Sequence, residues 1–262
     1  MSDIDGTLIH NDQIPQRNID ALQRFVKGGG RLGLSTGRSL MNYEYIAAQL
    51  PINLPCVLFN GSMIFDRAAQ KIIWETFLPT SSRDYFERIV RTFPDAEAMV
   101  VDRSYYHEIS LNRAPNPLHK HHSHIKRFHQ SANEIEGTDW YKGLFLLGEE
   151  RMKQLHEYLR TQNFSDVRFV NTNACMMEML PAGSSKGEAL KRLMDMEGFT
   201  ADQLVAIGDY YNDFEMIKLA GLGVTIKDSP EDIKAQADLV VGLCQNGALA
   251  DLVEYLEDTY GY

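Results

Sequence analysis

Strand-like and helix-like segments alternate over the first eighty residues and again after Pro181. Near the start, Asn18–Lys27 carries apolar residues at helical spacing, and the short strand-like run Arg31–Ser35 follows it. Near the end, the helix-like run Ser185–Met196 precedes the strand-like run Leu204–Gly208. Alternation of this kind predicts an α/β domain in which helices cover a sheet of parallel strands.

The middle of the chain has a different pattern. A helix is predicted over Ser82–Thr92 and strands follow it without regular alternation, while the polar, proline-containing stretch Asn112–Glu136 interrupts them. An α+β unit inserted into a parallel-sheet domain would give this order. We therefore expect a core made of residues 1–78 and 182–262 and an inserted domain over residues 79–181.

Charge and cysteine content exclude several classes of function. The chain has 36 acidic and 26 basic residues, a formal charge of −10, which argues against a nucleic-acid-binding protein because such a protein needs a basic face. The three cysteines, Cys56, Cys175 and Cys244, form no CxxC motif, so neither a disulfide framework nor a cysteine zinc site is expected. The sequence has no apolar run long enough to span a membrane and no signal-peptide pattern, so we expect a cytoplasmic protein without a membrane partner.

The most informative run is Asp3–Thr7, which reads DIDGT. In extended backbone, Asp3 and Asp5 would point the same way, and at the end of a parallel strand they would lie where α/β sheets bind ligands. One aspartate can then attack phosphorus while the other transfers a proton. A calcium loop does not fit, because it would place Met1 at the first ligand position; a solvated turn remains an alternative. Only two residues precede Asp3, so either the first strand is short or residues upstream of Met1 complete it.

Two further runs lie where helices are predicted to begin. Leu34–Arg38 reads LSTGR, and its hydroxyl groups and free backbone N–H groups suit a phosphoryl group, although an ordinary helix cap would use the same residues. Ser184–Gly187 reads SSKG and places Lys186 in the first turn of a helix, where a cation disfavours the helix dipole. An anionic partner would explain that lysine, and a surface side chain with its ammonium group in water is the alternative.

A fourth run, Gly208–Asp213, reads GDYYND and follows a predicted strand. Asp209 would lie at the end of that strand, and Asp213 lies four residues on, near the start of a helix. Hard carboxylate oxygens of this kind suit Mg²⁺. A purely structural alternative makes Asp213 a helix cap and Asp209 part of a turn.

The order of these four runs resembles that of the haloacid dehalogenase superfamily, in particular its Cof-type phosphatases of the capped class IIB. The matching positions are the run Asp3–Thr7, Thr36, Lys186, and Gly208-Asp209 with Asn212-Asp213. Asn60-Gly61 and the run Glu178–Gly187 are also similar to this group. The resemblance implies a Rossmann-like parallel-sheet core, formed by residues 1–78 and 182–262, with a type IIB α/β cap over residues 79–181.

The resemblance also implies roles for single residues. Asp3 would be the nucleophile that forms an aspartyl-phosphate, and Asp5 would protonate the leaving alcohol and then activate water. The residues implied to bind the substrate phosphate are Thr36, Gly37, Lys186 and Asn212. The residues implied to hold Mg²⁺ are Asp3, Asp5 through its backbone carbonyl, Asp209 and Asp213.

The resulting hypothesis is a Mg²⁺-dependent phosphatase whose partner is a small phosphorylated metabolite, such as a sugar phosphate or a phosphorylated cofactor. A phosphomutase similar to the phosphomannomutases and a non-catalytic metabolite-binding protein are the alternatives. We expect a monomer or a weak homo-oligomer.

Five histidines gather in the polar stretch of the middle region: His119, His121, His122, His124 and His129. A transition-metal site would use imidazoles. The stretch lacks regular periodicity and contains neighbouring cations, which favours a solvated segment. A third possibility is that its cations contact an anionic substrate.

Overall fold

The computed structural model describes residues 1–109 and 126–261, and of the five clustered histidines only His129 lies in this part. The chain divides into two compact units: Met1–Glu75 together with Ser185–Tyr262, and the inserted Thr76–Ser184. We call them the core unit and the inserted unit. The sequence placed these boundaries after residues 78 and 181.

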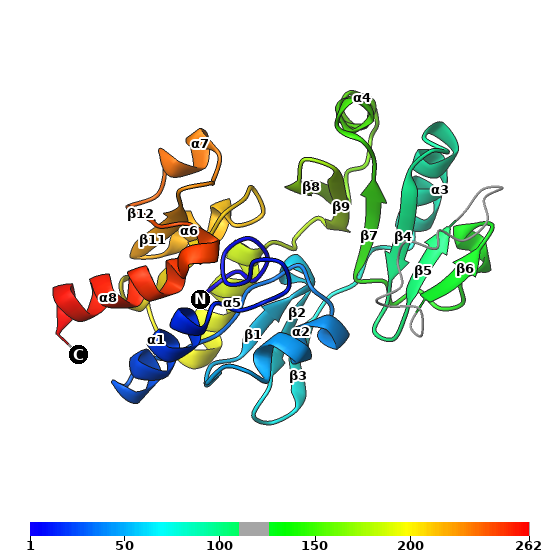
Figure 1. Cartoon of the computed structure of the whole chain (residues 1–262). Coiled ribbons are helices and arrows are strands. Elements are labelled where there is room, and N and C mark those ends of the chain that lie inside the picture. The colour runs from blue at the N-terminus through cyan, green and yellow to red at the C-terminus, as the bar shows by residue number, and fades with distance from the viewer. Residues whose placement is uncertain (110–125, 262) are drawn as a thin grey trace. The chain divides into compact units, whose positions relative to one another are not determined.

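The core unit is built on parallel strands (Figure 1). Three strands pair in parallel in the order β10 (Val205–Gly208), β11 (Leu222–Ile226) and β12 (Leu239–Val241). Ser2 forms parallel bridges to Ile207 of β10 on one side and to Leu34 on the other. The Asp3 N–H donates to the Ile207 carbonyl at 2.9 Å, and the Ser35 N–H donates to the Ser2 carbonyl at 2.8 Å. The segment before the first motif therefore lies between two other segments of the sheet.

The elements of the core unit come from both ends of the chain. Its helices are α1 (Gln16–Lys27), α2 (Leu40–Ala47), α5 (Lys186–Glu197), α6 (Phe214–Leu219), α7 (Glu231–Lys234) and α8 (Ala248–Tyr260). Its strands are β1 (Cys56–Leu58), β2 (Met63–Asp66), β3 (Lys71–Glu75), β10 (Val205–Gly208), β11 (Leu222–Ile226) and β12 (Leu239–Val241). One apolar cluster joins the two halves, since Val57 and Ile64 from the first half pack with Leu190, Leu193 and Met216 from the second. Burial of such side chains is the main favourable contribution to folding.

Asn60-Gly61 connects β1 to β2, which pair as antiparallel strands with Leu58 opposite Met63. Asn-Gly is a frequent residue pair in such hairpin turns. Gly61 has a φ of +99°, and a Cβ atom there would lie 2.1 Å from the Ser185 carbonyl oxygen. Only glycine fits at this position, because other residues would meet both the strained backbone and the clash. The turn and the start of α5 are therefore in close contact.

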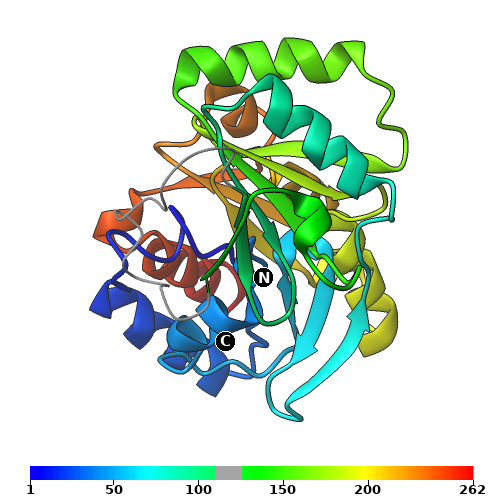
Figure 2. The ribbon, with the colours of Figure 1, turned by 90° about the vertical axis from the view of Figure 1, so that its right-hand side faces the viewer.

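The inserted unit contains one mixed sheet with strand order β6-β5-β4-β7-β9-β8. Its elements are α3 (Ser82–Thr92), β4 (Glu97–Val101), β5 (Tyr106–Ile109), β6 (Lys126–His129), β7 (Lys142–Leu146), α4 (Glu149–Thr161), β8 (Val167–Asn173) and β9 (Met176–Pro181). Helices α3 and α4 lie on the same face of this sheet (Figures 1 and 2), where Phe86 and Leu155 pack with Phe145. The fold is thus a parallel α/β core with an inserted α+β unit, which confirms the predicted class.

One stretch was predicted wrongly. Part of the interruption expected over Asn112–Glu136 is strand β6, which pairs in parallel with β5 at the edge of the sheet. The buried Lys126 of β6 donates to Glu108 of β5 at 3.2 Å. Because an ion pair makes burial of this lysine possible, the residue that faces inward is polar and the usual apolar signal of a strand is missing.

Over residues 1–109 and 126–261, no helix combines the length and the apolar character needed to cross a membrane.

Candidate active site

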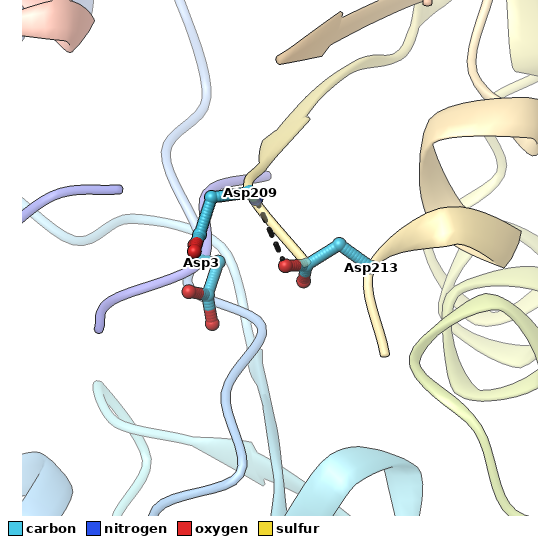
Figure 3. Close-up of side chains that lie close together, drawn as sticks. All are labelled: Asp3, Asp209 and Asp213. Carbon is cyan, nitrogen blue, oxygen red and sulfur yellow. Dashed lines mark hydrogen bonds between the residues drawn. The ribbon is translucent and has the colours of Figure 1, made fainter. Parts of the chain in front are cut away.

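Three carboxylates meet at the carboxyl end of the parallel strands. Asp3 follows the segment paired with β10, Asp209 follows β10 itself, and Asp213 lies at the N-cap position of α6. Figure 3 shows the side chains of Asp3 and Asp209 next to each other, with Asp213 facing them. One ligand atom from each residue lies within 4.8 Å of those of the other two. Such an arrangement of hard oxygen atoms can hold a divalent cation.

Lys186 is fully buried among these acids. Its Nζ donates to Asp3 Oδ1 and to Asp213 Oδ1, each at 2.5 Å. The alternative of a surface lysine with its ammonium group in water is therefore wrong. Since a buried ammonium is stable only with charged or hydrogen-bonding partners, the two aspartates explain why a cation occupies the first turn of α5.

The pKa values of the site reflect burial and crowding of like charges. Burial, followed by the neighbouring Asp213 carboxylate, raises the pKa of Asp3 well above its ordinary value, and Lys186 opposes this rise. Burial and Asp213 raise the pKa of Asp209 to about 7. Burial alone would lower the pKa of Lys186, but Asp213 and Asp3 raise it above the usual value. The acidic groups thus outnumber their cation, and added positive charge would stabilise the ionised form of the site.

The first motif also contributes its glycine and its threonine. Gly6 has a φ of +86°, and a Cβ atom there would lie 2.6 Å from Asp209 Oδ2, so only glycine lets the chain turn this close to the aspartate. The Thr7 hydroxyl donates to Asp209 Oδ1 at 2.7 Å. Thr7 therefore holds one potential metal ligand in place, as hydrogen bonds around metal ligands commonly do.

Asp5 has a different environment from Asp3. Its side chain is 57% exposed, and both of its carboxylate oxygens accept hydrogen bonds from one guanidinium: Arg38 Nε donates to Oδ2 at 2.9 Å and Nη2 donates to Oδ1 at 2.7 Å. Two carboxylates that are two residues apart are thus separated into a buried one beside Lys186 and an exposed one beside Arg38. Different environments allow two acids to perform different chemical tasks.

The residues expected to bind phosphate lie together next to the β1–β2 turn. Thr36 is buried, and its N–H donates to the Val57 carbonyl at 2.8 Å. A Cβ atom at Gly37 would lie 2.9 Å from Asn60 Nδ2, and Asn212 Nδ2 donates to Asn60 Oδ1 at 3.1 Å. The amide of Asn60 therefore connects the second motif to the fourth.

A separate cavity of about 470 Å³ lies at the other end of the parallel strands. Leu22, Phe25, Leu249 and Val253 are among its lining residues, and none of the site's acids lines it. Its one lining arginine, Arg31, is paired with Glu197, and none of the residues expected to bind phosphate lines it, so it is not the candidate site.

The structure brings most of the expected residues together, and it adds three that the sequence reasoning did not assign. Asp3, Asp209, Asp213 and Lys186 form one cluster, while the Asp5 side chain lies apart from it on Arg38. The residues without an assigned role were Thr7, Arg38 and Asn60. Thr7 and Arg38 are polar residues inside the runs Asp3–Thr7 and Leu34–Arg38, and this position was the sequence signal that could have assigned them to the site.

Comparison with known proteins agrees with this geometry. A family model described as haloacid dehalogenase-like hydrolase matches residues 1–253. The chain belongs to this family. The phosphatase YwpJ of Bacillus subtilis is 27% identical over 289 residues, covering 97% of this chain and 98% of the relative. The 5-amino-6-(5-phospho-D-ribitylamino)uracil phosphatase YwtE, also of Bacillus subtilis, is 26% identical over 286 residues, covering 97% and 96%.

A solved sugar phosphatase of subclass IIB in the same superfamily shares the fold, with a TM-score of 0.79, 18% identity and coverage of 97% of each chain. The predicted family, a capped haloacid dehalogenase-type phosphatase, is thereby confirmed. The predicted class of enzyme, a phosphoric monoester hydrolase, is confirmed with it.

Proposed function

We propose that this chain is a Mg²⁺-dependent phosphatase that hydrolyses a small phosphorylated metabolite through an aspartyl-phosphate on Asp3. The observation that carries the proposal is the contact of the buried Asp3 with Lys186, beside Asp209 and Asp213. The names of the relatives support the substrate class, since one acts on a phosphorylated ribityl compound and a solved structure of the same fold is a sugar phosphatase. In this proposal residues 1–78 and 182–262 are the catalytic core and residues 79–181 are the cap.

The donor set of the site fits a hard divalent cation. Asp3, Asp209 and Asp213 offer carboxylate oxygens within reach of one another. Burial, and after it the neighbouring Asp213 carboxylate, raises the pKa of Asp3 and of Asp209, so a bound cation would favour their ionised forms. Asp3 and Asp209 would hold Mg²⁺ together with the Asp5 backbone carbonyl, and Asp213 would orient this set. When bound, the ion neutralises the repulsion between a carboxylate and a phosphate dianion.

The chain's own residues would carry the reaction in two steps. In the first, an Asp3 oxygen forms a bond to phosphorus while the bond from phosphorus to the leaving oxygen breaks, and Asp5 gives that oxygen its proton. In the second, Asp5 takes a proton from water as the water attacks the aspartyl-phosphate, which restores Asp3 and releases phosphate. Lys186 Nζ, Thr36, Gly37 and Asn212 would bind the phosphoryl oxygens and stabilise the charge that builds up on them.

The test separates the two aspartates. Phosphate release from a set of phosphorylated metabolites should require Mg²⁺, stop in excess chelator and need no bisphosphate activator. Asp3→Asn should abolish turnover, because an amide is a very poor nucleophile, while the exposed Asp20→Asn serves as control. Asp5→Asn should lose about 10²–10⁴-fold, the usual range for general acid–base catalysis.

With an activated aryl phosphate, whose leaving group needs no proton, Asp5→Asn should give a rapid burst followed by slow turnover. Mass spectrometry of the quenched enzyme should find the phosphoryl group on Asp3. Detection of that group on another residue, or wild-type turnover by Asp3→Asn, would refute the mechanism.

A further inference from the structure

The carboxylate of Asp5 depends on Arg38 for its position. Both oxygens accept from this guanidinium, at 2.9 Å and 2.7 Å, in the two-pronged geometry that is the strongest form of this ion pair. In the part of the chain that the structure describes, no other side chain donates to the Asp5 carboxylate. An exposed carboxylate without such a partner would move among several rotamers.

Arg38 makes three further hydrogen bonds, one from its side chain and two from its backbone. Its side-chain Nη1 donates to the Asn42 carbonyl in α2 at 3.3 Å. Its backbone N–H donates to Thr36 Oγ1 at 3.1 Å, and its carbonyl accepts from the Phe59 N–H at 3.1 Å. The arginine is only 18% exposed, against 57% for Asp5. The guanidinium is therefore the fixed partner and Asp5 is the one whose position it sets.

We propose that Arg38 is a positioning residue that aims the Asp5 carboxyl group at the leaving oxygen and then at the attacking water. This inference rests on the proposed function. Because Asp5 transfers a proton through one oxygen at a time, one hydrogen bond to Arg38 can persist while the other opens. The hydrogen bond from the Arg38 N–H to Thr36 Oγ1 connects Arg38, and through it the Asp5 carboxylate, to the loop expected to bind phosphate. A bound substrate would therefore affect the loop and the Asp5 carboxylate together.

The test is a double-mutant cycle between Arg38 and Asp5. In wild-type background, Arg38→Met should lower kcat for an alkyl phosphate by about 10²-fold, the cost of a catalytic group displaced by about 1 Å. In the Asp5→Asn background the same change should alter kcat less than about twofold, since there is no longer a catalytic carboxylate to position. Arg38→Lys should not restore activity, because a lysine cannot form the two parallel bonds.

A matched control contacts the same helix, α2. Arg67 donates from Nε and Nη2 to Glu44 of α2 in a similar two-pronged pair, and Arg67→Met should leave kcat unchanged. Equal losses from Arg38→Met in both backgrounds, or wild-type kcat in Arg38→Lys, would overturn the assignment while leaving the proposed function intact. If Arg38→Met does not fold, the cycle is run with Arg38→Lys, to which the same outcomes apply. Absence of turnover in the wild-type protein would overturn the proposed function and this inference with it.

Discussion

Replacing the buried ammonium should destabilise the core in a pH-dependent manner. Lys186→Met removes two hydrogen bonds of 2.5 Å and leaves Asp3 and Asp213 without their shared cation. Removing one partner of a buried ion pair costs about 3–5 kcal/mol. For a chain of this size that loss lowers the unfolding temperature by on the order of 10 °C. Catalytic activity should disappear as well.

The pH dependence follows from the carboxylates. Lys186 has a pKa raised above 10.5, so in the wild type it stays charged and fully stabilising at pH 5.5 and at pH 7.5. The pKa of Asp209 is raised from 3.8 to about 7, so the folded state keeps this proton up to a higher pH than the unfolded state does. The free energy of unfolding therefore falls as the pH rises from 3.8 to about 7. Because Lys186 lowers the pKa of Asp3 and of Asp209, both pKa values rise further when it is removed. The loss in Lys186→Met should therefore be large at pH 7.5 and small at pH 5.5, and Mg²⁺ should recover part of it.

The assay is urea unfolding followed by tryptophan fluorescence. The two tryptophans lie in different units, so Trp140→Phe leaves Trp74 in β3 as the reporter of the core. Lys191→Met, on the exposed face of α5, breaks only a surface pair with Glu188 and should cost less than about 1 kcal/mol at either pH. An equal loss at both pH values for Lys186→Met, or a loss no larger than that of the control, would refute the reasoning.

Three further changes test other parts of the site. Thr7→Val removes the hydrogen bond to Asp209 and should weaken Mg²⁺ affinity, measured by calorimetry, by about 10-fold or more, whereas Thr7→Ser should keep it; equal affinities would count against this role. Gly61→Ala should cost more than about 3 kcal/mol in urea unfolding because its Cβ meets Ser185, while Gly29→Ala, also at φ +99° but with open space, should cost about 1–2 kcal/mol. As the pH is raised from 5 to 7, the apparent Mg²⁺ affinity should increase by up to about 10-fold per pH unit, because at lower pH the ion has to displace the Asp209 proton; an affinity that does not change between pH 5 and pH 7 would contradict the raised pKa.

The fold was predictable because most elements carry their signal locally. Helix α3 begins and ends where the apolar spacing placed it, and the β1–β2 turn follows from Asn60-Gly61. Strand β6 could not be recognised in the same way, because its inward-facing Lys126 is compatible with burial through Glu108 and Glu97, which lie on other strands. The four-residue helix α7 is too short to show a helical period.

The candidate site shows the same division between local and long-range information. The motifs place Asp3 and Asp209 at the ends of neighbouring strand segments, so their proximity follows from parallel topology. The burial of Lys186 and the pairing of Arg38 with Asp5 depend on contacts between distant parts of the chain. A sequence pattern indicates that such residues are polar and near a helix start, but it does not indicate which partner they contact.

The division of the core between the two ends of the chain has a consequence for synthesis on the ribosome. Asp3 belongs to the first segment, whereas Lys186, Asp209 and Asp213 belong to the last, with the whole inserted unit between them. At about 5–20 residues per second, roughly ten seconds or more separate the emergence of Asp3 from that of Lys186. The inserted unit can fold during this interval, but the first half of the core cannot complete its sheet. The nascent chain therefore passes through a stage in which the inserted unit has emerged completely and Asp3 still lacks Lys186, Asp209 and Asp213 as neighbours.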